Sequence, residues 1–230
     1  TISLVMPMKD WFDRNSNPEV GGIYANPGWE DTAGDLAERS VSVEFFEPVT
    51  SEQFHIDAAV RLAGGSSTDP WKMDKLSMRL KFTSRFGSTK LRFPLFGDQA
   101  TDEFDTLVLD ARMNNSWAYG GGVGISRPGL GQRDIAQYTR DQFVADIQNA
   151  MGGYAPNGRH IHLYLNGLYW GLYWLHERPD EHFAAAYLGG EDEDYDVLKH
   201  NSGQVVNGSA SEYNRMINSA NAGLRTNTQY

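Results

Sequence analysis

Residues 161–177 read IHLYLNGLYWGLYWLHE and contain two apolar runs separated by Asn166 and Gly167. The first run alternates apolar and polar residues, which is the period of a β-strand. Asn and Gly tolerate the positive φ angles of a two-residue type I′ turn, so the pair predicts a tight β-hairpin. The return strand is apolar on both faces, as is typical of an interior strand. Gly171 interrupts one of these faces, and we expect another group to approach the backbone there.

Composition narrows the class of protein. The net charge of −10 argues against an extended nucleic-acid-binding surface, although it allows a local basic pocket. The chain has no cysteine, which excludes disulfides and thiolate chemistry. No run of about 18 apolar residues is present, so no membrane span is expected in this chain. Because it begins at Thr1 with strand-like sequence and no signal peptide, we interpret it as a processed piece of a longer protein.

Two styles of sequence divide the chain near residue 115. Residues 1–115 contain alternating apolar runs, which predict a strand-rich lobe built on an antiparallel sheet. Residues 116–230 contain helical patterns around the hairpin, which predict a mixed helical lobe with the hairpin at its centre. We therefore expect an α+β fold with two layers of secondary structure. The strands expected in the first lobe are 39–48, 54–62, 75–82 and 106–111.

Three helices are expected in the second lobe. The first spans about 133–151 and ends at a Gly pair. The second begins near Pro179 and stops at Gly189. The third follows a capping box at Ser209–Glu212, presents an apolar stripe and ends at Gly223. The apolar face of the first helix would consist of Ile135, Tyr138, Phe143, Ile147 and Met151.

A basic strand face lies beside a Gly-Ser loop. Arg61 lies on the polar face of one predicted strand, and Lys75 and Arg79 lie on the polar face of the next. The loop between them contains Gly65 and Ser66, small residues that let backbone N–H groups approach a phosphate. If the two strands are neighbours, this arrangement predicts an anion site. The alternative interpretation is a solvated sheet face whose basic residues oppose edge-to-edge pairing.

Other polar clusters are weaker candidates. His176 and His182 lack the spacing of a helical zinc motif, and a strand end followed by a capped helix explains them better than a metal site. The acidic run 191–196 lacks the central Gly of a calcium loop, which favours a solvated acidic turn. Residues 114–117 are either polar site residues or a turn, and the Gly-rich stretch 119–133 is a long loop. P-loop, ordinary protein-kinase and serine-nucleophile motifs are absent from the sequence.

Six segments, taken in their order along the chain, resemble the spore-coat protein H (CotH) kinase family of large bacterial surface or secreted proteins. They are GGIYANP, RSVSVEFFEP, RLAGGSSTDPWKMDKLSMRLKF, YTRDQFVADIQNAMG, HLYLNGLYWGLYWLHERPDEHF and DYDVLK. The resemblance extends from about Gly21 to Lys199. It implies an atypical protein-kinase-like fold that uses ATP and Mg²⁺ to phosphorylate Ser or Thr of a protein substrate. It also implies an extracellular or bacterial cell-surface location.

The resemblance implies roles for two residues. Lys75 matches the family's Lys after its Gly-Ser block, a contact to the nucleotide phosphates. Glu177 matches the Glu that closes the family's Gly-x-Tyr strand near the nucleotide cleft, where Lys75 or Arg178 would be its partner. The family's catalytic and metal-binding aspartates belong to Asp-rich motifs that we do not find in this chain. We therefore leave the catalytic residues unassigned and expect a C-terminally truncated domain whose metal ligands lie beyond Tyr230.

Two functions from different classes follow. The first is an ATP-dependent protein Ser/Thr kinase, of which this chain is the nucleotide-binding front part. The alternative is a non-catalytic bacterial surface module for adhesion or carbohydrate binding, which the six Trp and eleven Tyr residues suggest. Sugar stacking needs Trp117, Trp170 or Trp174 exposed on one surface, whereas the hairpin pattern predicts that most are core. The nucleotide contacts predicted for the kinase are Lys75, Arg79, Arg61, Gly65, Ser66 and Glu177.

Overall fold

The computed structural model divides the chain into two compact units, Thr1–Arg178 and Pro179–Tyr230. The residues that the structure describes are 1–26, 33–64, 68, 75–112, 136–199, 204–224 and 226–227. The predicted lobe boundary near residue 115 lies in the stretch 113–135, outside the described residues.

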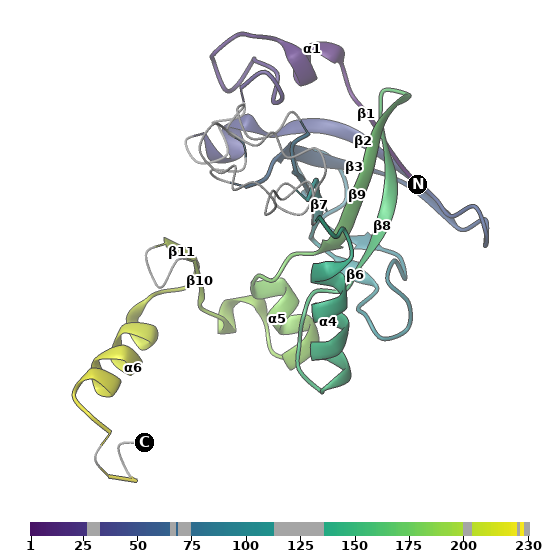
Figure 1. Ribbon diagram of the computed structural model, residues 1–230. Helices are drawn as coiled ribbons and strands as arrows, with labels where there is room; N and C mark the ends of the chain where they lie inside the picture. Colours follow the sequence, from purple (N-terminus) through teal and green to yellow (C-terminus); the bar gives the residue numbers. More distant parts are fainter. Residues whose placement is uncertain are drawn as a thin grey trace, which may run out of the picture. The chain divides into compact units, whose positions relative to one another are not determined.

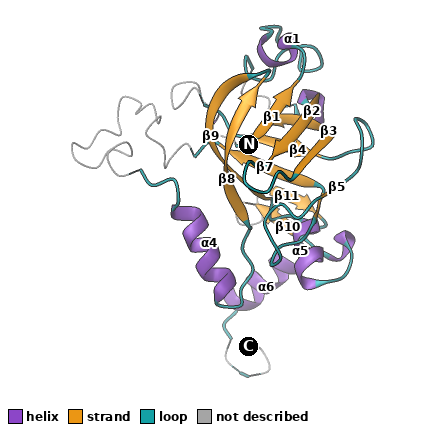
Figure 2. Cartoon of the chain, turned by 90° about the vertical axis from the view of Figure 1, so that its right-hand side faces the viewer, coloured by secondary structure: helices purple, strands orange, loops and turns teal. Residues whose placement is uncertain are grey.

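In the described part of the first unit, seven strands close into a barrel in the order β1-β2-β3-β4-β7-β9-β8 (Figures 1 and 2). Their bounds are β1 Ile2–Val5, β2 Arg39–Phe46, β3 Gln53–Leu62, β4 Met78–Lys81, β7 Thr106–Asp110, β8 Gly158–Leu165 and β9 Leu168–Glu177. Neighbouring strands are antiparallel except β1 and β8, which run parallel. The α+β class is confirmed, but the sheet is mixed because the N-terminal strand closes it against β8.

The hairpin of β8 and β9 completes this closed sheet. The helical patterns around it predict a position in a helical lobe, but β9 pairs with β7 and β8 pairs with β1. The reason is that a hairpin with apolar faces needs strand partners for its outer hydrogen bonds, and the strands of the first half supply them. The hairpin therefore shares one compact unit with the strands of residues 1–112.

The turn of the hairpin has the predicted geometry. Asn166 and Gly167 both have positive φ, 48° and 82°, as a type I′ turn requires. The Asn166 side chain accepts a hydrogen bond from the Met6 N–H at 3.0 Å and donates one to the Met6 carbonyl at 2.8 Å. The predicted hairpin is therefore confirmed, and its turn is tied to the chain that leaves β1.

β9 is an interior strand, paired on both sides, as its sequence predicts. It is buried on both faces only in its second half, where Tyr173, Trp174 and Leu175 are at most 7% exposed. Leu168 and Tyr169, next to the turn, are exposed. The reason is the length of β7, which pairs with β9 from Trp174 onward, so that among the described residues no strand pairs with the first half of β9 on that side.

The alternating apolar residues of β2 and β3 fill the barrel. Val41, Val43 and Phe45 of β2 are buried while the residues between them are more exposed, and Val60 and Leu62 of β3 are buried as well. Each large apolar side chain that is removed from water contributes roughly 1.5–3 kcal/mol to folding. The predicted inward faces of these strands are confirmed.

Smaller elements lie outside the barrel strands in the first unit. They are α1 (Met8–Phe12), the 3₁₀ helix η1 (Gly34–Ala37), the two-stranded sheet of β5 (Leu91–Arg92) and β6 (Glu103–Phe104), and α4 (Arg140–Ala150). Trp11 of α1 is fully buried. Gly22 packs against α1 so closely that a Cβ atom there would lie 2.4 Å from the Phe12 nitrogen, a distance that only glycine permits.

The predicted apolar face of α4 is not buried. Phe143, Ile147 and Met151 are 64%, 43% and 82% exposed, and Ala145 is the buried residue among the described positions of the helix. The polar side of α4 faces the sheet instead, where the Gln142 carbonyl accepts a hydrogen bond from Trp174 Nε1 at 2.7 Å. The burial prediction was wrong because hydrogen bonds to the sheet orient this helix.

The second unit contains α5 (Glu181–Leu188), η4 (Asp192–Asp194), β10 (Val197–Lys199), β11 (Gln204–Asn207) and α6 (Ser211–Asn221). Asp180 caps α5 by accepting a hydrogen bond from the Phe183 N–H, and Gly189 ends it with φ 82°, as predicted. The predicted capping box of α6 is wrong, because Ala210 occupies the N-cap without a side-chain hydrogen bond.

The acidic run of the second unit forms η4, a turn of 3₁₀ helix. Glu191 and Asp194 form a capping box at its N-terminus, in which the Asp194 carboxylate accepts a hydrogen bond from the Glu191 N–H at 2.9 Å. The short antiparallel pair of β10 and β11 follows, which the sequence pattern did not predict. Across the described residues of both units, no helix is long and apolar enough to cross a membrane.

Candidate functional site

The predicted basic face lies on neighbouring strands. β3 and β4 are antiparallel neighbours, and their register places Arg61 directly opposite Arg79. The buried Glu38 is close enough for Arg61 and Arg79 to act on its pKa, yet that pKa is raised, chiefly by burial and by Asp35. The expectation that the strands of Arg61 and Arg79 are neighbours is therefore confirmed. The carboxyl group of Glu38 also lies near the two arginines. Gly65 and Ser66 lie outside the described residues.

Lys75 reaches from the segment before β4 to β9. Its Nζ donates a hydrogen bond to the carbonyl of Leu172 and lies 4.3 Å from the centre of the Tyr173 ring. A Cβ atom on Gly171, where φ is 136°, would lie 3.3 Å from Lys75 Cε. Gly171 therefore leaves the space that the Lys75 side chain occupies, which confirms the predicted close approach at this glycine.

The environment of Lys75 changes its acid–base behaviour. Burial lowers the pKa of Lys75 to about 8, and the nearby Asp110 carboxylate opposes part of this effect. At neutral pH the side chain is therefore mainly a cation that has lost much of its hydration. A cation in this state binds an anion more strongly than a fully hydrated one, because less water has to be displaced.

Three aromatic side chains fix the backbone next to Lys75. Tyr173 Oη donates to the Leu76 carbonyl at 3.0 Å, and Tyr24 Oη accepts from the Leu76 N–H at 3.2 Å. Trp170 Nε1 donates to the same Tyr24 oxygen at 2.8 Å. Both backbone groups of Leu76 are thus held by tyrosines from distant parts of the chain, a contribution that sequence periodicity could not reveal.

Asp110, at the end of β7, is a further residue that the sequence reading missed. Its Oδ1 accepts hydrogen bonds from Ser77 Oγ at 3.2 Å and from the Arg112 N–H at 2.7 Å. Ser77 Oγ in turn accepts from the Ala111 N–H at 2.9 Å. One carboxylate bond and one backbone bond thus join Ser77, the residue before β4, to the end of β7, while the Arg112 N–H orients the carboxylate locally. The Asp in TLVLDA was the available signal, but nothing local distinguishes it from a turn residue.

Glu177 is the last residue of β9, whereas Lys75 contacts the middle of that strand at Leu172. Its Oε2 accepts hydrogen bonds from the Asn157 N–H at 2.7 Å and from Asn157 Nδ2 at 2.9 Å, and the residue is 3% exposed. Lys75 contacts Leu172, and five residues of extended strand span about 16 Å. The expected pairing of Glu177 with Lys75 therefore does not form, because β9 separates the two groups.

We expect the Asn157 contacts to decide the response of Glu177 to substitution. Glu177→Leu leaves the Asn157 donors without their acceptor and should lower the free energy of unfolding by about 1–3 kcal/mol. Glu177→Gln retains an acceptor oxygen and should cost less than about 1 kcal/mol. Urea denaturation of both variants measures the difference. Equal losses would show that Glu177 stabilises the fold by packing alone.

His176 and Trp174 of the hairpin pack within the fold. His176 stacks on Trp174 with ring centres 4.1 Å apart, and burial lowers its pKa, so its imidazole is neutral at pH 7. Trp174 is 7% exposed and Trp170 is half-buried, while Trp117 lies outside the described residues. In the part of the chain that the structure describes, no group of three or more His, Asp or Glu residues could hold a metal ion.

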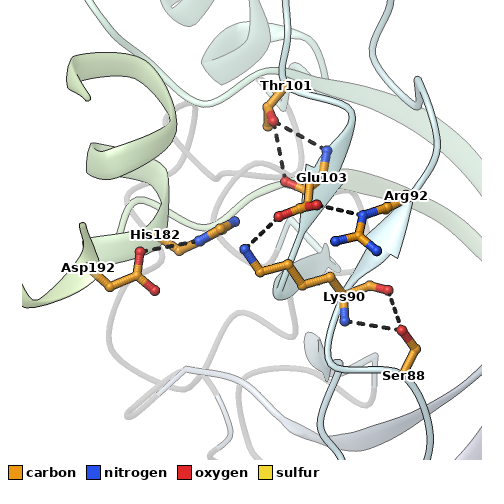
Figure 3. A network of polar contacts seen from close by, with 7 residues as sticks. All are labelled: Ser88, Lys90, Arg92, Thr101, Glu103, His182 and Asp192. Atoms are coloured by element: carbon orange, nitrogen blue, oxygen red, sulfur yellow. Dashed lines mark hydrogen bonds and ion pairs between the residues drawn. The ribbon is translucent and has the colours of Figure 1, made fainter. Parts of the chain in front are cut away.

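Two polar clusters at other positions are shown in Figure 3. In the first unit, Lys90 and Arg92 both bond the Glu103 carboxylate at 2.6 Å and lower the pKa of Glu103. In the second unit, His182 Nδ1 lies 3.3 Å from an oxygen of Asp192. The Arg92 side chain is 75% exposed, so its pair with Glu103 is screened by solvent and contributes little to stability.

Residues 133–228 match the family model of CotH kinase protein. No curated protein matches the chain. The CotH match confirms the resemblance over α4, β8, β9 and the second unit, which together are less than half of the chain. It also supports a CotH-like function. It includes Glu177 but not Lys75, so the interpretation of Lys75 depends on its geometry.

Proposed function

We propose that this chain is the nucleotide-binding part of an ATP-dependent protein kinase of the CotH type, which phosphorylates Ser or Thr of a protein substrate. The observation that carries the proposal is the partly desolvated ammonium of Lys75, which the segment before β4 holds over Gly171 and Tyr173 of β9. The CotH match of residues 133–228 supports the reaction class.

Lys75 is suited to bind a phosphate. An ammonium group has three N–H donors, and among the described residues one of them is bonded, to the Leu172 carbonyl. The remaining donors can bond phosphate oxygens, and the partly buried charge strengthens such bonds. Phosphoryl transfer depends mostly on positioning and electrostatic stabilisation, which a fixed cation supplies.

Arg61 and Arg79 extend the proposed anion site along the sheet. Two buried guanidinium nitrogens of Arg61, Nε and Nη1, have no hydrogen-bond partner among the described residues. A bound anion would satisfy them, and two guanidinium groups side by side favour one over a neutral ligand. Gly65 and Ser66 remain proposed contacts that the described residues do not include.

The other parts of the proposal rest on the CotH match. Mg²⁺ would accompany ATP and neutralise phosphate charge, but the described residues offer no cluster of carboxylates and imidazoles for it. We therefore assign no metal ligand and no catalytic base. Glu177 lies inside the matched stretch and supports the fold at its end of β9. An extracellular or bacterial cell-surface location is proposed on the same resemblance.

We expect Lys75→Ala in the full-length protein to raise the dissociation constant for ATP about 10- to 100-fold, since a hydrogen bond to a charged group contributes roughly 1.5–3 kcal/mol. The matched control is Lys90→Ala, which removes a surface cation bonded to Glu103 and should change the constant less than twofold. Isothermal titration calorimetry measures both.

Two outcomes would contradict the proposal. Equal effects of Lys75→Ala and Lys90→Ala would make Lys75 an ordinary surface charge. A folded wild-type protein that binds no ATP would favour the alternative function, a non-catalytic surface module for adhesion or carbohydrate binding.

A further inference from the structure

Arg112 occupies an unusual position directly after β7. Its backbone φ is 60°, a left-handed conformation that costs a non-glycine residue about 1 kcal/mol or more. Its side chain is 1% exposed, and its guanidinium lies 4.9 Å from the Trp174 ring. Strain of this kind persists only where surrounding contacts hold it.

The contacts that hold Arg112 are two carboxylates. Arg112 Nη1 donates to Asp110 Oδ2 at 3.2 Å and also to Asp141 at the start of α4. The Arg112 N–H bonds the other oxygen of Asp110 at 2.7 Å. With the hydroxyl of Ser77, both oxygens of Asp110 are engaged, so its carboxylate has a fixed position and orientation.

The groups around Lys75 and Asp110 come from several elements. Tyr173 of β9 and Tyr138, before α4, present their rings to the Lys75 ammonium, and burial raises the pKa of Tyr173. Arg112, Asp141 of α4 and His176 of β9 surround Asp110, and His176 is neutral. Asp110 accepts a hydrogen bond from the hydroxyl of Ser77, two residues after Lys75, and this contact holds its carboxylate near the Lys75 side chain. Among the described residues, it is the charged group that opposes the effect of burial on the pKa of Lys75.

We infer that Asp110, clamped by Arg112, is a positioning residue that holds a fixed negative charge near the Lys75 ammonium and keeps that ammonium available to an anionic ligand. Arg112 fixes the Asp110 carboxylate in place. Because its single positive charge is divided between Asp110 and Asp141, it does not fully neutralise Asp110, and negative charge remains near Lys75. The inference rests on the proposed nucleotide function only for the identity of the anion.

The test measures the charge state of Lys75 directly. Acetic anhydride reacts with the neutral amine, so the pH dependence of Lys75 acetylation, followed by mass spectrometry of the intact folded protein, gives its titration midpoint. For the wild type we expect a midpoint near 8. Asp110→Asn removes the opposing charge and should lower that midpoint by about one pH unit. Asp110→Glu should restore it, and Asp57→Asn, which neutralises an exposed carboxylate on β3, should leave it unchanged.

ATP affinity provides a second readout. Loss of the Lys75 charge should raise the Asp110→Asn dissociation constant about threefold or more relative to wild type at pH 7.5, and the ratio should return toward one at pH 6. Because ATP titrates equally in both experiments, the ratio of the variant and wild-type dissociation constants at one pH is free of that effect. If the substitution instead damaged the fold, lowering the pH to 6 would not restore the affinity for ATP. Circular dichroism verifies that the variant is folded.

The outcomes separate the inference from the proposed function. An unchanged Lys75 midpoint in folded Asp110→Asn overturns the inference, whatever the protein binds. If that variant does not fold, a wild-type midpoint near that of free lysine, about 10.4, overturns it instead. A shifted midpoint in a protein that binds no ATP supports the inference and rejects only the proposed function.

Discussion

A Trp11→Ala variant is expected to lose about 3–5 kcal/mol of its free energy of unfolding, the range typical of a fully buried tryptophan. Trp11 is 0% exposed and packs edge-on against Tyr24 with ring centres 6.2 Å apart. Its Nε1 has no hydrogen-bond partner among the described residues, which places the expected loss toward the lower end of the range.

The neighbouring Phe12→Ala is the matched control for this prediction. Phe12 belongs to the same short helix and also contacts Tyr24, but it is 39% exposed. We expect it to lose less than about 1.5 kcal/mol, because its removal leaves little enclosed space. Urea denaturation with unchanged m-values measures both variants. Similar losses would show that α1 contributes through its backbone rather than through the buried indole.

The Trp11 substitution should also reach the candidate site. The hydroxyl of Tyr24 accepts hydrogen bonds from Trp170 Nε1 and from the N–H of Leu76, the residue that follows Lys75. Loss of the fully buried Trp11 ring leaves Tyr24 free to shift, so the acetylation midpoint of Lys75 should change more in Trp11→Ala than in Phe12→Ala, whose ring is partly exposed. This result would demonstrate that α1 supports the placement of Lys75.

Arg112→Met is expected to lower the free energy of unfolding by about 2–3 kcal/mol. Removing one partner of a buried ion pair usually costs about 3–5 kcal/mol, because the remaining charge stays buried without compensation. Here the carboxylates of Asp110 and Asp141 are 27% and 46% exposed, so water can hydrate them and the expected loss is smaller.

The control applies the same substitution to a solvated ion pair. Arg92→Met breaks the contact of Arg92 with Glu103 at the protein surface, where the arginine is 75% exposed, and should cost less than about 0.5 kcal/mol. Thermal and urea denaturation at low ionic strength are suitable measurements. Equal costs at both positions would mean that Arg112 is as well hydrated as Arg92, in conflict with its buried position.

Local pattern was sufficient to predict the elements with short-range causes. The turn at Asn166 and Gly167, the inward faces of β2 and β3, and the helix between Asp180 and Gly189 all depend on side-chain period or on φ angles within a few residues. The close approach at Gly171 was also predictable, because a glycine in an apolar strand indicates that another group needs the space.

The tertiary structure alone decided which groups meet. Lys75 contacts a carbonyl 97 residues further along the chain, and Asp110 is held by Ser77, 33 residues before it. Strand closure between β1 and β8 and the polar contact that turns the apolar side of α4 outward are likewise long-range. The same pattern that places Glu177 on a buried strand face cannot tell Asn157 from Lys75 as its partner. Periodicity specifies the face on which a residue lies, whereas its neighbours across the sheet depend on register and strand order, which form only when the whole barrel closes.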